Sequence, residues 1–164
     1  MRTRIIILTV LAVVVLGTVA AHAQVPQVRQ YAAKFICGKA SDEQEKLFLA
    51  APGQYYTVIN VHNPALTAAL KFQKKFTVGL PGEKVGQISK FFAVALKADE
   101  TMQIDCGDIY GHLAIAPGTF IEGFAVLQVT PVQRELDVVG VYTAAGGAGV
   151  STLHMERVAG RVTQ

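Results

Sequence analysis

The residues best suited to chemistry lie in one short stretch, Asp105 to His112, which holds two aspartates, a cysteine and a histidine. Asp105, Asp108 and His112 could act together, because a carboxylate beside an imidazole orients the ring and tunes its proton affinity for general-base catalysis. The same carboxylates and nearby carbonyl groups are the kind of oxygen ligand that Ca²⁺ takes. The stretch therefore suggests either a small acid–base site or a metal site.

Other features of the sequence favour a structural role for this stretch. Aspartate and glycine near the end of a strand are common turn residues, since aspartate accepts hydrogen bonds from neighbouring backbone N–H groups. A blue-copper site would need two histidines, a free thiolate and an axial ligand; His62 could serve, but Ala116 stands where a methionine would be sought. The chain has no nucleophile elbow, zinc-protease pair or phosphate-binding loop. We expect no catalytic residue and no cofactor, with a metal-binding or enzymatic role of the stretch as the alternative.

A second candidate site is a cluster of lysines, Lys71, Lys74 and Lys75, which could attract acidic glycans, lipid headgroups or an acidic protein surface. Apolar and polar residues alternate from Leu70 to Val78, which predicts a half-buried strand. Lys74 is the exception, because it falls on the apolar side. The competing explanation is that these lysines protect an edge strand from aggregation.

The amino terminus has the three parts of a secretory signal peptide. Arg2 and Arg4 precede an apolar run from Ile5 to Leu16, and an Ala-x-Ala site ends at Ala23. The apolar run is shorter than the roughly 20 residues that a membrane-spanning helix needs. We expect residues 1–23 to be removed after Ala23, so that the mature protein is periplasmic or secreted and has no transmembrane segment.

Cleavage would change the charge of the protein. Removal of two arginines lowers the number of basic residues from 15 to 13, against 12 acidic ones, so the formal net charge falls from +3 to +1. A nearly neutral protein gives no electrostatic reason to expect binding to nucleic acid. The remaining residues, 24–164, suit a single domain.

Both cysteines, Cys37 and Cys106, lie in the predicted mature chain. An even number of cysteines in an oxidising compartment predicts a disulfide between them. Two buried free thiols are the alternative.

Short apolar or alternating segments separated by turn residues dominate the mature sequence. Seven or eight strands are predicted, with no strong helix. This pattern favours an all-β fold, a single antiparallel β-sandwich of immunoglobulin-like architecture, over a βαβ arrangement.

Three segments, 55–64, 120–124 and 136–144, resemble a group of uncharacterised secreted bacterial proteins with β-sandwich-like folds. The resemblance spans most of the mature chain. It implies export and a β-fold, and it implies no activity and no functional residue.

The sequence therefore predicts an exported, non-catalytic β-sandwich protein that serves as a structural or binding module in the periplasm or outside the cell. Its partner is unidentified; a protein or an acidic surface fits the lysine cluster, and self-association is possible. The alternative is a small secreted metal-binding protein or enzyme that uses Asp105, Asp108 and His112.

Overall fold

A computed structural model describes residues 27–42, 50–146 and 149–164, so the predicted signal peptide, 1–23, lies outside the described residues. The described chain forms ten strands and one helix. Their bounds are β1 (Val28–Ala40), β2 (Gly53–His62), β3 (Leu70–Leu80), β4 (Lys84–Ile88), β5 (Phe92–Leu96), β6 (Thr101–Asp105), α2 (Cys106–Leu113), β7 (Ile121–Val129), β8 (Asp137–Gly146), β9 (Gly149–Arg157) and β10 (Arg161–Thr163). No described helix has the length and apolar character needed to cross a membrane.

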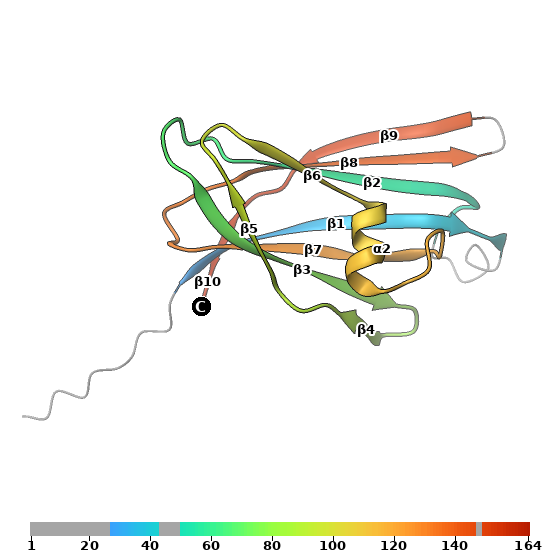
Figure 1. The fold of residues 1–164 in the computed structure, drawn as a ribbon. Coiled ribbons are helices and arrows are strands. Elements are labelled where there is room, and N and C mark those ends of the chain that lie inside the picture. Colours follow the sequence, from blue (N-terminus) through green and yellow to red (C-terminus); the bar gives the residue numbers. More distant parts are fainter. Residues whose placement is uncertain (1–26, 43–49, 147–148) are drawn as a thin grey trace, which may run out of the picture.

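The strands make one large antiparallel sheet, in the order β4-β3-β7-β1-β2-β8-β9 (Figure 1). Three strands lie off this path: β5 pairs with β3, β6 with β2, and β10 with β1. The prediction of an antiparallel β-fold is confirmed, with ten described strands where seven or eight were predicted. β3 follows the predicted alternation, because Phe72, Phe76 and Val78 are buried whereas Lys71 and Gln73 are exposed.

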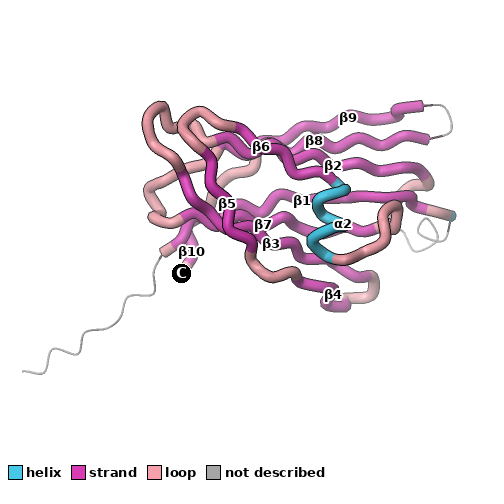
Figure 2. Tube along the Cα trace, in the orientation of Figure 1, coloured by secondary structure: helices cyan, strands magenta, loops and turns pink. Residues whose placement is uncertain are grey.

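The helix α2 corrects the expectation that the chain has no strong helix. It runs for eight residues directly after β6, and in Figure 2 it is the cyan segment among magenta strands. Ile109, Tyr110 and Leu113 are its buried residues, and they join the same hydrophobic core as the sheet. The helix lies across one face of the sheet (Figure 1), and its buried residues pack into the core.

One edge of β2 is shared between two strands. β1 pairs with the beginning of β2 over Gly38–Ala40, and β6 pairs with the same edge farther along, over Val58–His62. β8 occupies the opposite edge of β2 throughout. We call the place where β1 and β6 separate along β2, around Thr57, the fork.

The core is enclosed by strands of the sheet, including β5 and β6, and by α2. Its buried side chains come from β1, β2, β3, β5, β6, β7, β8 and α2, so no single pair of elements forms it. The largest are Phe35, Phe76, Ile59, Ile104, Ile109, Leu113 and Leu127.

Asn63 holds the connection after β2 in place. Its side chain is fully buried, and its amide nitrogen donates to the carbonyls of Ala68 (2.9 Å) and Lys97 (2.7 Å). Its side-chain oxygen accepts from the N–H of Ala65 (3.2 Å). One amide thus links the segment after β2 with the turn between β5 and β6.

Candidate functional site

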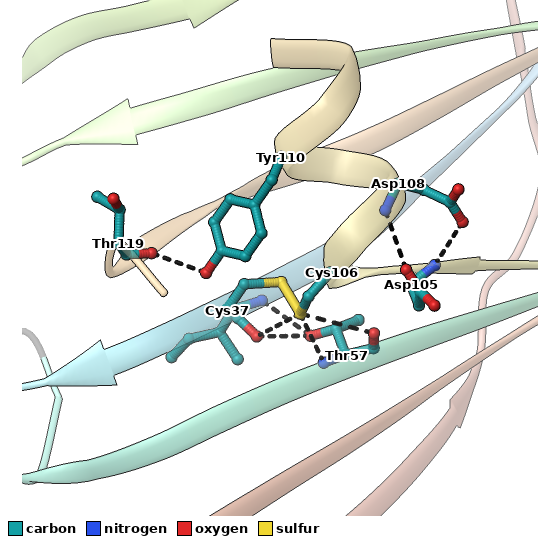
Figure 3. The surroundings of a disulfide bond; sticks show 8 residues. Cys37, Thr57, Asp105, Cys106, Asp108, Tyr110 and Thr119 are labelled. Carbon is teal, nitrogen blue, oxygen red and sulfur yellow. Dashed lines mark hydrogen bonds between the residues drawn. A yellow bond between two sulfur atoms is a disulfide. The ribbon is translucent and has the colours of Figure 1, made fainter. Parts of the chain in front are cut away.

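The fork is closed by a disulfide. Cys37 of β1 and Cys106, the first residue of α2, are bonded across a sequence separation of 69 residues (Figure 3). This confirms the predicted pairing and leaves no free cysteine in the chain. A structural disulfide indicates an oxidising, extracytoplasmic compartment.

Thr57 fills the fork beside the disulfide. Its hydroxyl oxygen accepts from the N–H of Ile36 (2.9 Å), and its O–H donates to the carbonyl of the same residue (2.8 Å). Its own N–H donates to the Sγ of Cys106 at 3.2 Å. Thr57 is 1 % exposed, so these bonds satisfy backbone groups that have lost their ladder partners where the strands separate (Figure 3).

Asp105 and Asp108 form a capping box at the start of α2. The carboxylate of Asp105 accepts from the N–H of Asp108 (2.9 Å), and the carboxylate of Asp108 accepts from the N–H of Asp105 (3.1 Å). Such a reciprocal pair satisfies two backbone donors at a helix N-terminus. Both carboxylates thus have a structural role. Aspartate was expected to accept hydrogen bonds from backbone N–H groups of a turn, and here the two aspartates do so at the start of a helix.

His112 lies between two aromatic rings. Its ring centroid is 5.3 Å from that of Phe76 and 4.1 Å from that of Phe92. Burial lowers the pKa of His112, the Lys74 ammonium lowers it further, and Asp108 opposes both effects. Burial and the Lys74 ammonium therefore favour the neutral form of the imidazole over the charged form.

The described residues contain no group of three or more His, Cys, Asp or Glu side chains that could hold a metal ion. Of the predicted acid–base residues, Asp105 and Asp108 both hold the cap of α2, and Asp108 and His112 also lie within electrostatic reach of Lys74. The structure thus brings Asp108, His112 and Lys74 together, while both carboxylates are engaged in hydrogen bonds at the helix cap.

The predicted lysine cluster is divided between two faces of the sheet. Lys71 is exposed and Lys75 half-buried on the outer face, where the Lys75 ammonium lies 4.7 Å from the centre of the Phe91 ring. Lys74 points to the core side, is 7 % exposed, and has a pKa lowered by burial. The structure thus brings two of the three lysines to one face.

The explanation of these lysines as guards of an edge strand is wrong. β3 is paired with β7 along one edge and with β4 and β5 along the other. The alternation placed Lys74 on the apolar side correctly, but periodicity within one strand carries no information about its neighbours.

A third surface was not identified from the sequence: the outer face of β2, β8 and β9. Ile59 and Val61 point to the core and are fully buried, so the residues that alternate with them point outward. The register places Tyr56 and Val58 of β2 beside Thr143 and Val141 of β8, and these in turn beside Leu153 and Met155 of β9.

We call Tyr56, Val58, Val141, Leu153 and Met155 the outer apolar face. Tyr56 is 49 % exposed, Leu153 63 % and Met155 64 %, while the two valines between them are half-buried. The available signal was the alternation of Leu153 and Met155 with His154 and Glu156 in the last long strand.

A cleft adjoins the outer apolar face at the fork. It has a volume of about 420 Å³ and a mostly apolar lining that includes Tyr56, Val58, Cys106, Tyr110 and Pro117. Because Tyr56 and Val58 belong to both, the cleft and the outer apolar face are continuous.

Comparisons with known proteins add no family: no family model matches the chain, and no curated protein or solved structure matches it.

Proposed function

We propose that this protein is an exported, non-catalytic module that binds another protein through the outer apolar face and the adjoining cleft. The observation that carries the proposal is the exposure of Tyr56 on β2 and of Leu153 and Met155 on β9, on one face of the sheet with Thr143 and Val141 of β8 between them. Contiguous exposed apolar surface is typical of interaction sites, and aromatic and methionine side chains are enriched there. A cleft beside the face could take one apolar side chain of the partner.

Export rests on the sequence of the amino terminus and on the disulfide. Residues 1–23 have the composition of a signal peptide with cleavage after Ala23. A disulfide that staples a single domain persists in the periplasm or outside the cell. The resemblance of three segments to secreted bacterial proteins supports the same compartment.

We also propose that the ten-stranded sheet is arranged as a β-sandwich. β10 and β2 occupy different lengths of one edge of β1, Val28–Gln30 and Gly38–Ala40. The strands on either side of this division, β7 and β3 on one hand and β8 and β9 on the other, would then belong to two sheets that face each other. The core, to which β1, β2, β3, β6 and β7 contribute, is consistent with this arrangement.

Photo-cross-linking in the producing cell tests the proposed function. A photoreactive amino acid replaces Tyr56 or Leu153, and a matched variant carries it at Val85, which is 86 % exposed on β4. We expect protein adducts from positions 56 and 153 and few from position 85. Equal adduct yields at all three positions, or none at any, would overturn the proposal.

The alternative, a metal-binding protein or enzyme that uses Asp105, Asp108 and His112, has its own test. Elemental analysis of the purified protein, together with the His112→Ala variant, measures any bound metal. A near-stoichiometric metal that is lost in the variant would favour the alternative over a non-catalytic module.

A further inference from the structure

We infer that the partner of β9 is a second copy of the same chain, joined by antiparallel pairing of the two β9 strands around a two-fold axis at Met155. This inference rests on the proposed function and names its partner. It is carried by the backbone direction, the side chains and the charges of Leu153–Arg157.

The backbone of β9 presents hydrogen-bonding groups away from β8. The N–H of Val158 donates to the carbonyl of Val138 at 2.8 Å, which identifies these two as a pair that exchanges hydrogen bonds. In an antiparallel ladder such pairs alternate with pairs whose N–H and C=O groups point away from each other. By this alternation, Arg157, Met155 and Leu153 belong to pairs of the second kind. Their backbone N–H and C=O groups therefore point away from β8.

These groups form an open edge. Within the described ranges no strand pairs with the side of β9 opposite β8. The same three residues place their side chains on the side of the outer apolar face, beside Thr143, Val141 and Val139 of β8. Backbone donors and acceptors and apolar side chains are therefore offered to a partner by the same residues.

A two-fold axis at Met155 uses all of these groups. Met155 then faces Met155 of the other copy, and each Leu153 faces Arg157 of the other copy. Every one of these is a pair that exchanges hydrogen bonds, which gives about six bonds between the copies. Isologous contacts of this kind are closed, so that the assembly stops at two chains.

The pairing of His154 with Glu156 selects this register among its neighbours. Within one chain the Nε2 atom of His154 already lies 4.0 Å from a carboxylate oxygen of Glu156, a pair that is ionic when His154 is protonated. With the axis at Met155, His154 of one copy lies opposite Glu156 of the other, twice, in the closer kind of cross-strand pair. An axis at His154 or at Glu156 would place like residues opposite each other. An axis at Leu153 would move Glu156 away from His154 of the other copy and lose this pair.

The other end of the sheet lacks these properties. β4 has five residues, begins with Lys84, and is irregular in its register with β3 between Thr77 and Gly79. Short strands, lysines and bulges discourage edge-to-edge pairing. β9 has nine residues without lysine or proline. Of the two strands that end the main path of the sheet, β4 is thus protected and β9 is receptive to a further strand.

The decisive variant is Met155→Pro, measured by sedimentation equilibrium of the mature protein over a concentration series. Proline removes an N–H that points away from β8, so β9 stays in its sheet while the hydrogen bonds at the axis are lost. We expect reversible dimers of the wild-type protein and about tenfold or greater weakening by Met155→Pro. Met155→Leu and Val85→Glu are the matched controls, with dimerisation unchanged.

Thermal unfolding followed by circular dichroism verifies that Met155→Pro is folded. If it is not, Leu153→Lys replaces it, because that change places a like charge opposite Arg157 of the other copy without altering the backbone. A wild-type protein that stays monomeric up to several hundred micromolar overturns the inference, as does dimerisation that survives the folded variant.

Single cysteines test the register. Met155→Cys should form disulfide-linked dimers under mild oxidation, because the two Cα atoms would be about 5.5 Å apart. Leu153→Cys should not, since it faces Arg157 of the other copy. Equal cross-linking at both positions contradicts the axis at Met155.

The outcomes also separate this inference from the proposed function. Photo-adducts of position 153 with the mass of two copies support both. If the protein is monomeric in solution and its adducts contain a different polypeptide, the proposed function stands. In that case the partner is not a second copy of the chain.

Discussion

Thr57 and Ile36 are joined by a reciprocal pair of hydrogen bonds, in which one hydroxyl group serves both the N–H and the C=O of Ile36. The pair lies where β1 leaves the edge of β2, so a side chain continues a contact that the backbone ladder can no longer make. The stability of the fork should therefore depend on this hydroxyl more than on the volume of the side chain.

Thr57→Val tests the hydroxyl, because valine has nearly the same shape. We expect the free energy of unfolding to fall by about 1–3 kcal/mol, the cost of leaving buried polar groups unpaired. Urea denaturation measures the change. Thr77→Val is the control, since the Thr77 hydroxyl is exposed and makes one long contact of 3.5 Å with the carbonyl of Phe124. Equal losses in the two variants would contradict the role of Thr57.

Cys37→Ala removes the cross-link and keeps the Cys106 sulfur that accepts from Thr57. For a sequence separation of 69 residues, the chain-entropy model gives a loss of roughly 4 kcal/mol. The double variant Cys37→Ala/Cys106→Ala should lose about 1 kcal/mol more, because the N–H of Thr57 then has no acceptor. Chemical denaturation of both variants separates the two contributions. A double variant as stable as Cys37→Ala alone would show that the hydrogen bond from the N–H of Thr57 to the Cys106 sulfur does not stabilise the fold.

The pKa of His112 should respond in opposite directions to its two charged neighbours. Lys74→Met removes a positive charge and should raise the pKa, whereas Asp108→Asn removes a negative charge and should lower it. NMR titration of the imidazole protons measures both shifts against the wild-type protein. Shifts of the same sign in both variants would mean that structural rearrangement, and not the neighbouring charges, determines the pKa of His112.

The lowered pKa of His112 also fixes the sign of its effect on stability. The unfolded chain, with an ordinary histidine pKa of about 6.5, binds a proton more readily than the folded protein. The contribution of His112 to stability is therefore complete above that pH and is lost as the pH falls toward the folded-state value. His112→Phe should make the free energy of unfolding less sensitive to acid in this window.

Asp105→Ala should destabilise the start of α2 by about 1 kcal/mol, because the N–H of Asp108 loses its acceptor. Asp105→Ser is the control, since a serine hydroxyl can take the same position at the cap. Thermal unfolding of the two variants measures the difference. A serine variant no more stable than the alanine variant would show that the carboxylate acts in another way.

The strands were predictable from the sequence wherever one face meets the core and the other meets solvent. β3 is the clearest case, because Phe72 and Phe76 alternate with polar residues. The helix α2 was not predictable from composition, since Gly107 and Gly111 lie within eight residues and glycine disfavours helices. The spacing of Asp105 and Asp108 was the available signal, and it resembles turn chemistry when the packing of Ile109 and Leu113 is unknown.

The sites were less predictable than the strands because they depend on neighbours. The pairing of Cys37 with Cys106 followed from their number alone. The position of His112 between Phe76 and Phe92 requires β3, β5 and α2 to meet, which no local pattern encodes. The outer apolar face likewise exists only in the register of β2, β8 and β9.

The buried amide of Asn63 has a consequence for the chemical durability of the protein. Deamidation to aspartate would replace a nitrogen that faces carbonyl groups of Ala68 and Lys97 with an oxygen, turning attraction into repulsion. The usual route to that lesion begins with attack by the backbone N–H of the next residue, and here that residue is Pro64, which has none. Pro64 should therefore slow the deamidation of Asn63, the residue whose amide holds this loop in place.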